Sequence, residues 1–298
     1  MKKISKKITV MFLGLCMTML FSNGVVVASP GSNNAIVTES TQDTSILVSK
    51  TVTNEYDKYK ELTSKSDQTL LQEGYSKEDL KKLRSIDYKA ELKKRVVENA
   101  KLDDETLNKK GYTPEQIMQI RSYVGTEDQL QALSASLYLS TYVLSHSKSS
   151  SLSTANLRTD WTWTSAPILE MQDVVAAAWS EGMYLQSANS YATASYYNQS
   201  SDVYHHTETY SVTPNLNNGA SVTFNVLSAS YPGTYAKTGQ FGTYVSKQSS
   251  VLELAVKTQY GHSTIFVRPS VSFSGTPGLS FSTGVTTEGT QDIYIPTM

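Results

Sequence analysis

Two histidines and one glutamate have the spacing of a candidate metal site. In the stretch VYHHTETY, a strand would place His206 and Glu208 on one face, because strand side chains alternate between faces. His262, in YGHSTI, would supply the third ligand of a two-histidine, one-carboxylate site for zinc or iron. The alternative is a polar sheet edge facing solvent, since nothing in the sequence brings His262 near Glu208.

Carboxylates offer a second kind of chemistry. Asp173 and Glu181 flank the apolar run VVAAAWS and are the best-placed pair for acid–base hydrolysis of the glycosidase type. The competing explanation is that both residues only solvate the ends of a strand. The chain has no HExxH, no phosphate-binding glycine loop, no calcium loop and no dinucleotide fingerprint. The sequence therefore predicts no cofactor, and it favours a non-enzymatic protein over an enzyme.

Aromatic residues indicate binding. Trp161 and Trp163 share one strand face in DWTWT, and the chain has 19 tyrosines against 7 phenylalanines. Tryptophan and tyrosine combine a large rigid contact area with a polar tip, which suits sugars, peptides and membrane interfaces. Tyrosine is also a strong strand former, so packing at the edge of a core explains the same composition.

A twelve-residue motif occurs twice, 37 positions apart. GYSKEDLKKLRS begins at Gly74 and GYTPEQIMQIRS begins at Gly111. Each glycine can take the left-handed conformation that ends a helix. The Ser or Thr two residues later can cap the next helix, and the Asp or Gln three positions further on completes a capping box. The motif therefore predicts two helix-turn-helix joints, arranged as a short helical repeat.

Four residues of the motif are not explained by capping. They are the paired tyrosines and arginines, Tyr75, Tyr112, Arg84 and Arg121. The tyrosines would serve binding if the two turns form a recognition surface. The arginines would lie at the rim of the core and pair with carboxylates. We therefore name these four residues, with the two tryptophans, as candidate binding residues.

Composition divides the chain into regions that must position these residues. Residues 29–52 form a polar lead-in, and residues 53–144 are charged, with Leu, Ile and Ala at helical spacing. The segment 128–144 is nearly uncharged and is expected to be the most buried helix. Residues 145–158 are a Ser-rich linker, and residues 159–298 alternate at period two between turn signals. We predict an α+β protein with an N-terminal helical region followed by an antiparallel, sandwich-like β domain.

The first 28 residues have the features of an export signal. Four lysines precede an apolar run from Ile8 to Phe21, and Val26 and Ala28 are small residues suited to cleavage after Ala28. The run is shorter than the roughly 20 residues that span a bilayer. Cys16, the only cysteine, lies inside it, so a cleaved protein contains no disulfide. We predict a secreted, extracellular protein.

Net charge excludes one class of partner. Removing the four leader lysines from 26 basic residues leaves 22 against 27 acidic residues, a net charge of −5. No basic patch remains that favours nucleic acid. The order of leader, paired GY[ST] motif, Ser-rich linker and Tyr/Ser/Thr-rich strands resembles uncharacterised exported proteins of Gram-positive bacteria, and that resemblance implies no activity.

The function expected from these features is binding outside the cell. The first hypothesis is a secreted non-enzymatic protein whose β domain binds a glycan, the cell wall or another protein. The second is a secreted hydrolase that uses carboxylates or the His/Glu site. The third is a membrane-active or pore-forming protein, because STIFVRPSVSFSGTPGLSFSTGV alternates like a hairpin. Short strands and Pro269 argue against the third.

Overall fold

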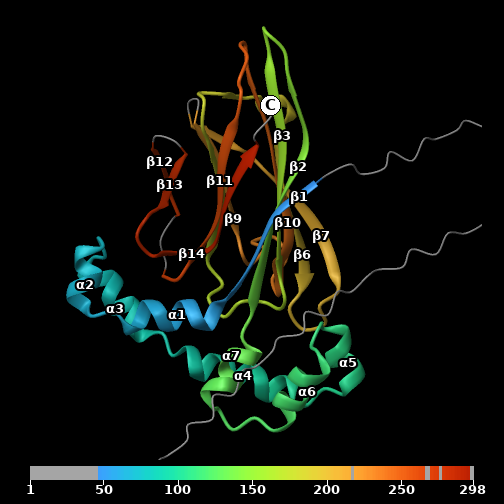
Figure 1. Cartoon of the computed structure of the whole chain (residues 1–298). Helices are drawn as coiled ribbons and strands as arrows, with labels where there is room; N and C mark the ends of the chain where they lie inside the picture. The colour runs from blue at the N-terminus through green and yellow to red at the C-terminus, as the bar shows by residue number, and fades with distance from the viewer. Residues whose placement is uncertain (1–45, 216–217, 266–268, 275–276, 296–298) are drawn as a thin grey trace, which may run out of the picture. The chain divides into compact units, whose positions relative to one another are not determined.

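A computed structural model of the protein describes residues 46–215, 218–265, 269–274 and 277–295 (Figure 1). The expected export signal, its cleavage site after Ala28 and most of the polar lead-in lie outside the described residues. Within the described part of the chain, no helix is long and apolar enough to cross a membrane.

Two antiparallel sheets form the β domain (Figure 1). The first sheet has seven strands, which in spatial order are β1 (Ile46–Asn54), β2 (Ser136–Lys148), β3 (Ser153–Trp163), β10 (Thr234–Lys247), β6 (Tyr191–Asn198) and β7 (Tyr204–Tyr210), with β5 (Tyr184–Leu185) paired to β10. The second sheet has five strands, β14 (Val285–Ile295), β11 (Leu254–Ser263), β4 (Gln172–Trp179), β9 (Gly219–Asn225) and β8 (Thr213–Asn215). Their inner faces share one hydrophobic core, so the predicted antiparallel sandwich is confirmed.

A separate hairpin, β12 (Val271–Ser274) with β13 (Gly278–Phe281), lies against the second sheet. A Cβ added to Gly261 of β11 would meet the ring of Phe281 at 2.9 Å, so this glycine allows the close approach. Each hairpin strand has four residues, fewer than the roughly 9–11 that a strand needs to cross a bilayer.

Period-two alternation explains which strand residues reach the core. In β3, every second residue from Ser153 to Trp163 is buried, and the residues between are more exposed. In β4, all residues after Gln172 are buried, because this strand lies inside the second sheet and is covered on both faces. Its small alanines suit that position, since they let neighbouring layers pack closely.

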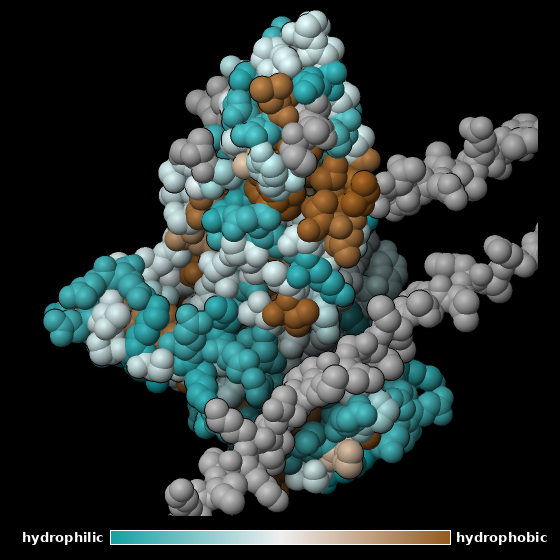
Figure 2. All heavy atoms as spheres, in the orientation of Figure 1, coloured by the Kyte–Doolittle hydropathy of each residue, from teal (hydrophilic) through white to brown (hydrophobic). Residues whose placement is uncertain are grey.

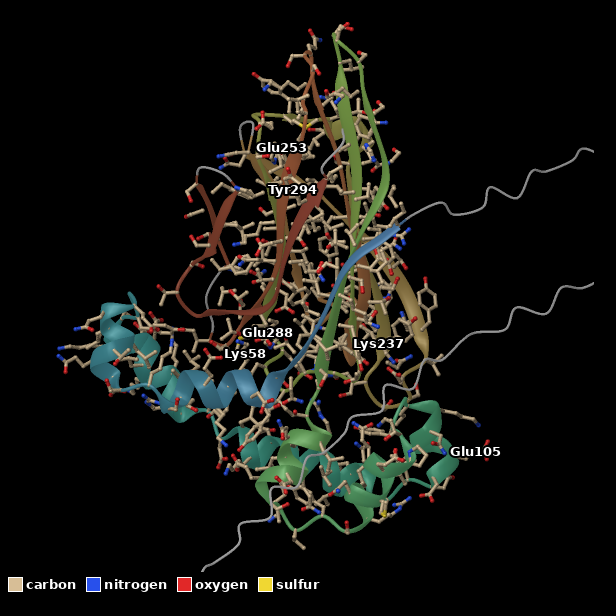
Figure 3. The ribbon with its side chains drawn as sticks, viewed as in Figure 1. Lys58, Glu105, Lys237, Glu253, Glu288 and Tyr294 are labelled. Atoms are coloured by element: carbon tan, nitrogen blue, oxygen red, sulfur yellow. The ribbon has the colours of Figure 1, made fainter. Side chains whose placement is uncertain are left out.

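The helices form a continuous insertion between β1 and β2. They are α1 (Glu55–Ser64), α2 (Asp67–Gln72), α3 (Lys77–Ser85), α4 (Tyr88–Asn99), α5 (Asp104–Lys109), α6 (Pro114–Arg121) and α7 (Glu127–Leu133). On the face shown in Figure 2, most of the visible helical surface is hydrophilic. Their apolar faces form two small cores of their own, which also include Leu169 and Ile265 from the β domain. Lys58 of α1 lies near the buried Glu288 of β14 (Figure 3).

Both predicted joints have the expected capping geometry. Gly74 and Gly111 have φ angles of +96° and +86°, the left-handed conformation that glycine tolerates best. Ser76 caps α3 in a capping box with Asp79, and an equivalent box caps α6. Each joint therefore ends one helix and starts the next, as the motif predicts.

The predicted region boundaries need three corrections. The end of the polar lead-in, residues 46–52, belongs to strand β1. The helix expected over 128–144 ends at Leu133, and most of the remaining segment is strand β2, because its Leu and Val residues also alternate at period two. The expected linker, residues 145–158, forms the end of β2, a turn closed by Ser149, and most of β3. Serine-rich composition here marks a hairpin, because serine favours both turns and exposed strand positions.

Candidate functional site

The three residues proposed as metal ligands do not assemble. His206 and Glu208 lie together on β7, with His206 Nε2 3.0 Å from Glu208 Oε1, as the alternation predicts. His262 lies on β11 of the other sheet and is fully enclosed. Among the described residues, no group of three or more His, Cys, Asp or Glu side chains could hold a metal ion. The ligand set fails because its members are divided between the two sheets.

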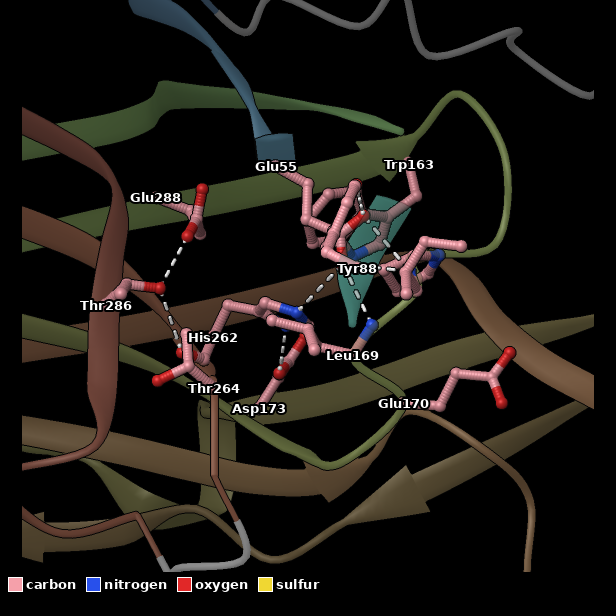
Figure 4. Close-up of polar contacts among 12 residues, drawn as sticks. Glu55, Tyr88, Trp163, Leu169, Glu170, Asp173, His262, Thr264, Thr286 and Glu288 are labelled. Carbon is pink, nitrogen blue, oxygen red and sulfur yellow. Dashed lines mark hydrogen bonds and ion pairs between the residues drawn. The ribbon is translucent and has the colours of Figure 1, made fainter. Parts of the chain in front are cut away.

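His262 instead belongs to a buried ionic cluster that joins the first helix to the sandwich (Figure 4). Its Nδ1 lies 2.7 Å from Asp173 Oδ1 on the neighbouring strand β4, and its Nε2 lies 3.7 Å from Glu55 Oε1. Glu55, the first residue of α1, also accepts hydrogen bonds from the Tyr88 hydroxyl and from backbone N–H groups at 168–169. The cluster therefore ties α1 and α4 to the second sheet.

Opposite charges outweigh burial in this cluster. Burial would lower the pKa of His262, but Asp173 and Glu55 raise it well above its usual range. Burial would raise the pKa of Glu55, but His262 and the backbone donors keep it below its usual value. His262 is therefore a cation held between two carboxylates. Because each of the three residues is at most 1% exposed, no substrate reaches them, and the cluster acts as a clamp between elements.

Only part of this clamp had a signal in the sequence. Asp173 and His262 are direct partners across β4 and β11, and an acidic residue at the start of an otherwise apolar strand could have indicated a buried partner. Glu181, the predicted partner of Asp173, lies instead in the turn after β4 with a φ angle of +65°. Glu55 is about 200 residues from His262 along the chain, so no local pattern connects them.

The paired tryptophans are part of the sandwich core. Trp161 stacks on Phe224 with ring centroids 4.8 Å apart. Trp163 donates a hydrogen bond from Nε1 to the Tyr260 hydroxyl at 3.0 Å. Both tryptophans are at most 1% exposed, so they do not form the binding platform that was predicted. Alternation correctly placed them on one face of β3, but that face points into the protein.

The paired arginines form matching locks. Arg84 donates hydrogen bonds to the carbonyl oxygens of Thr63 and Lys65 and pairs with Asp67 at 2.9 Å. Arg121 makes the same contacts 37 residues further on, with the carbonyls of residues 100 and 102 and with Asp104. Each arginine therefore fixes the turn between the first two helices of its repeat. The predicted carboxylate pairing is present, and these contacts give both arginines a structural role.

Tyr112 lines a polar pocket where the second helical repeat meets the β domain. The α4–α5 pocket, as we call it, has a volume of about 510 Å³. Its helical wall comes from α4, from Leu102 and from the turn that follows α5, and its β wall comes from the loop 165–170, the turn 199–202 and Tyr235. A volume of this size suits a small ligand. Tyr112 is 8% exposed, so the tyrosine contributes one edge of the wall.

Hydrogen bonds organise the helical wall of the α4–α5 pocket. Lys110 Nζ donates to Asn99 Oδ1, and Asn99 Nδ2 donates to the Tyr112 hydroxyl, both at 2.8 Å. Arg95 donates to backbone carbonyls of the 165–170 loop and lies 3.6 Å from Glu170. These contacts fix side chains that carry both donors and acceptors into the cavity.

Acidic groups stand on the opposite wall. Asp202 accepts hydrogen bonds from the Tyr235 hydroxyl at 2.8 Å and from Lys237, which Figure 3 labels on β10. Burial raises the pKa of Glu170, although Arg95 opposes the shift. Burial also lowers the pKa of Lys110. The pocket therefore combines cations and carboxylates at a site with reduced access to water.

No family model matches this chain, and no curated protein matches it. Among solved structures it is similar to the collagen-binding subdomain of the Enterococcus faecalis surface protein ACE, with 8% identity over 49% of this chain and 88% of that one, and a TM-score of 0.24. The collagen-binding domain of a Staphylococcus aureus adhesin gives 10% identity, coverages of 51% and 97%, and a TM-score of 0.25. Clostridium perfringens delta-toxin gives 10%, coverages of 54% and 83%, and a TM-score of 0.18. Likenesses with such low TM-scores do not bear on what this chain does.

Proposed function

We propose that this protein is a secreted, non-enzymatic binding protein that takes part of an extracellular glycan into the α4–α5 pocket. The observation that carries the proposal is the pocket itself, a cavity of about 510 Å³ with fixed polar side chains on two walls. The buried tryptophans no longer support binding on the surface of the β domain. The binding site that we propose lies instead where the helices meet that domain.

The pocket chemistry favours a ligand rich in hydroxyl groups. Its walls carry three cations, Lys94, Arg95 and Lys110, and four carboxylates, of which Glu170 and Asp202 stand opposite the helices. Such nearly balanced charge offers no strong attraction to a polyanion or a polycation. A hydroxyl both donates and accepts, so a neutral sugar can satisfy ammonium, amide and carboxylate groups at once.

Titration calorimetry with neutral tetrasaccharides tests the proposal. We expect the protein to bind at least one of cellotetraose, maltotetraose and N-acetylchitotetraose, and Lys110→Met to weaken that binding about tenfold through loss of a charged donor. The matched control is Lys109→Met, because Lys109 pairs with Glu105 and does not line the pocket. Binding that is equal in both variants, or no binding of any sugar, would overturn the assignment.

Glu170 supports a second candidate function, the hydrolysis of such a glycan. Burial raises the pKa of Glu170 in the same pocket that contains Asp202, and glycosidases use two carboxylates with different surroundings. Hydrolysis would release new reducing ends from a bound tetrasaccharide. The variant Glu170→Gln would then stop release while binding continues. A wild-type protein that binds the sugar and leaves it intact would remove this alternative.

A further inference from the structure

Each helical repeat has a pocket at the equivalent position, so the first repeat adds a second pocket to the one described above. The α1–α2 pocket, of about 310 Å³, lies where the first repeat meets the β domain. Its helical wall consists of six residues, each of which has a counterpart 37 positions later in the α4–α5 pocket. The six pairs are Lys58/Arg95, Glu61/Glu98, Leu62/Asn99, Lys65/Leu102, Glu73/Lys110 and Tyr75/Tyr112.

The repeated joint explains why the two pockets correspond. Gly74 and Gly111 bring each turn close to the β wall of its own pocket. A Cβ on Gly74 would lie 3.1 Å from Thr283 Oγ1, and one on Gly111 would lie 3.8 Å from Asp202 Oδ2. Tyr75 and Tyr112, the next residues, are equally buried and line the two cavities. Both repeats therefore contact the β domain through residues at corresponding positions, and each repeat has a cavity beside this contact.

The walls of the α1–α2 pocket are polar. On the helical side, Lys58 pairs with Glu61 and Lys65 pairs with Glu73, each at 2.9 Å. On the β side, residues 282–287 form the turn after β13 and the start of β14, and they contribute several serine and threonine hydroxyls. A contact that served packing alone would be filled with apolar side chains. The balanced charge again favours a neutral ligand that can donate and accept hydrogen bonds.

We infer that the α1–α2 pocket is a second site for the same class of ligand, a neutral carbohydrate unit. The chain thus presents two related sites, one for each repeat, and takes up two units of sugar. This inference rests on the proposed function for the class of ligand, but it concerns a different cavity. Two sites on one chain also raise the apparent affinity for a polymer that reaches both.

Amide signals of two glycines separate the sites in a nuclear magnetic resonance titration. Gly111 precedes Tyr112 of the α4–α5 pocket, and Gly284 lines the α1–α2 pocket. The same three tetrasaccharides are added to the full chain. We expect one sugar to move both signals, Lys65→Met to weaken the Gly284 response about tenfold, and Lys110→Met to weaken the Gly111 response similarly. Lys77→Met, an exposed position outside both pockets, is the control for Lys65→Met.

Each outcome decides between the two proposals. Movement of Gly111 alone overturns the second site and leaves the proposed function in place. Movement of Gly284 alone, lost in Lys65→Met, supports the second site and removes the α4–α5 pocket as the binding site. Movement of both signals that neither lysine variant weakens overturns both assignments, as does the absence of any movement. The unchanged amide spectrum of each variant without sugar confirms that it is folded.

Discussion

The two helical repeats keep the same joint but differ in the pocket beside it. Their glycines, tyrosines, caps and arginine locks correspond at a period of 37 residues. At the pocket positions, Leu62 corresponds to Asn99, and Glu73 corresponds to Lys110. The joint is constrained because a left-handed turn and two helix ends admit few residues. The pocket positions carry no such constraint, so differences in ligand recognition between the repeats are expected there.

A second difference lies at the start of each repeat. Glu55 of α1 corresponds to Leu92 of α4, and both residues are about 1% exposed. The first repeat is attached to the sandwich through a buried ionic cluster, whereas the corresponding position of the second repeat packs in an apolar core. The two forms of attachment respond differently to mutation and to pH.

The largest effect on stability should come from replacing Glu55 of the first repeat with leucine, the residue at the corresponding position of the second repeat. Glu55→Leu removes the acceptor of two backbone N–H groups and of the Tyr88 hydroxyl, and it leaves His262 with one carboxylate. We expect a loss of about 3–5 kcal/mol in the free energy of unfolding, measured by urea denaturation. The exposed control Glu61→Gln should change it by less than about 0.5 kcal/mol. Equal values for the two variants would show that the cluster does not hold the first repeat.

The pH dependence of stability should also separate the repeats. Burial raises the pKa of Glu288, near Lys58 of the first repeat, from 4.5 to about 7. The unfolded chain releases this proton near pH 4.5 and the folded chain keeps it to about pH 7. Glu288 therefore stabilises the fold fully below pH 4.5, and this contribution is lost as pH rises through 7.

Comparison of glutamine variants measures this loss. Between pH 4.5 and 8.5, Glu288→Gln should gain about 3 kcal/mol relative to the wild type, because the pKa of Glu288 is about 7 in the folded protein and 4.5 in the unfolded chain. Glu170→Gln, opposite the second repeat, should gain in the same direction by less, because Glu170 is more exposed. Urea denaturation at both pH values is the measurement. Parallel pH profiles for Glu288→Gln and the wild type would contradict the prediction.

The arginine locks should contribute equally. Arg84→Met and Arg121→Met each remove two hydrogen bonds to carbonyl oxygens and one ion pair. Because both side chains are about one-third exposed, we expect a moderate loss of about 1–2 kcal/mol in each variant. Thermal unfolding followed by circular dichroism compares the two. A difference of more than about 1 kcal/mol would show that the locks are not equivalent.

The glycines should show the smallest difference. Gly74→Ala and Gly111→Ala both place a Cβ at a positive φ angle, which costs about 1–2 kcal/mol. Only at Gly74 does the added Cβ crowd a neighbour, Thr283 Oγ1 at 3.1 Å. We expect Gly74→Ala to be the less stable variant by about 0.5 kcal/mol in urea denaturation. The opposite order would contradict the described contact between the first joint and the β wall.

Local features of the fold, such as helix caps and turns, could be predicted from the sequence. Contacts between residues far apart in the chain could not. The caps and joints were predictable because Gly74, Ser76 and their counterparts act on residues within one turn. Alternation identified the face that Trp161 and Trp163 share, but it does not say whether a face is buried. Helical and strand spacing were both compatible with residues 136–144, and pairing with β1 and β3 decides for a strand.

The candidate site depends on contacts that no local pattern carries. Tyr112 was singled out by its repetition, yet Glu170, Asp202 and Tyr235 reach the same pocket only through the folding of the β domain. The period of 37 residues was the most informative signal, because it predicted the joints and also relates the two pockets. The period alone does not reveal the two pockets, because the β domain forms one wall of each pocket.

The position of the helices between β1 and β2 has a consequence for folding. Asn54 and Ser136 are direct partners in the sheet, so the 81 residues between them form one closed loop. Closing a loop of that length costs about 4 kcal/mol of chain entropy, far more than a two-residue turn. Pairing of β1 should therefore follow formation of the helices, which bring its end to β2 and shorten the effective loop. For the same reason, the insertion is a natural unit for replacement by a short turn, because its two ends already meet.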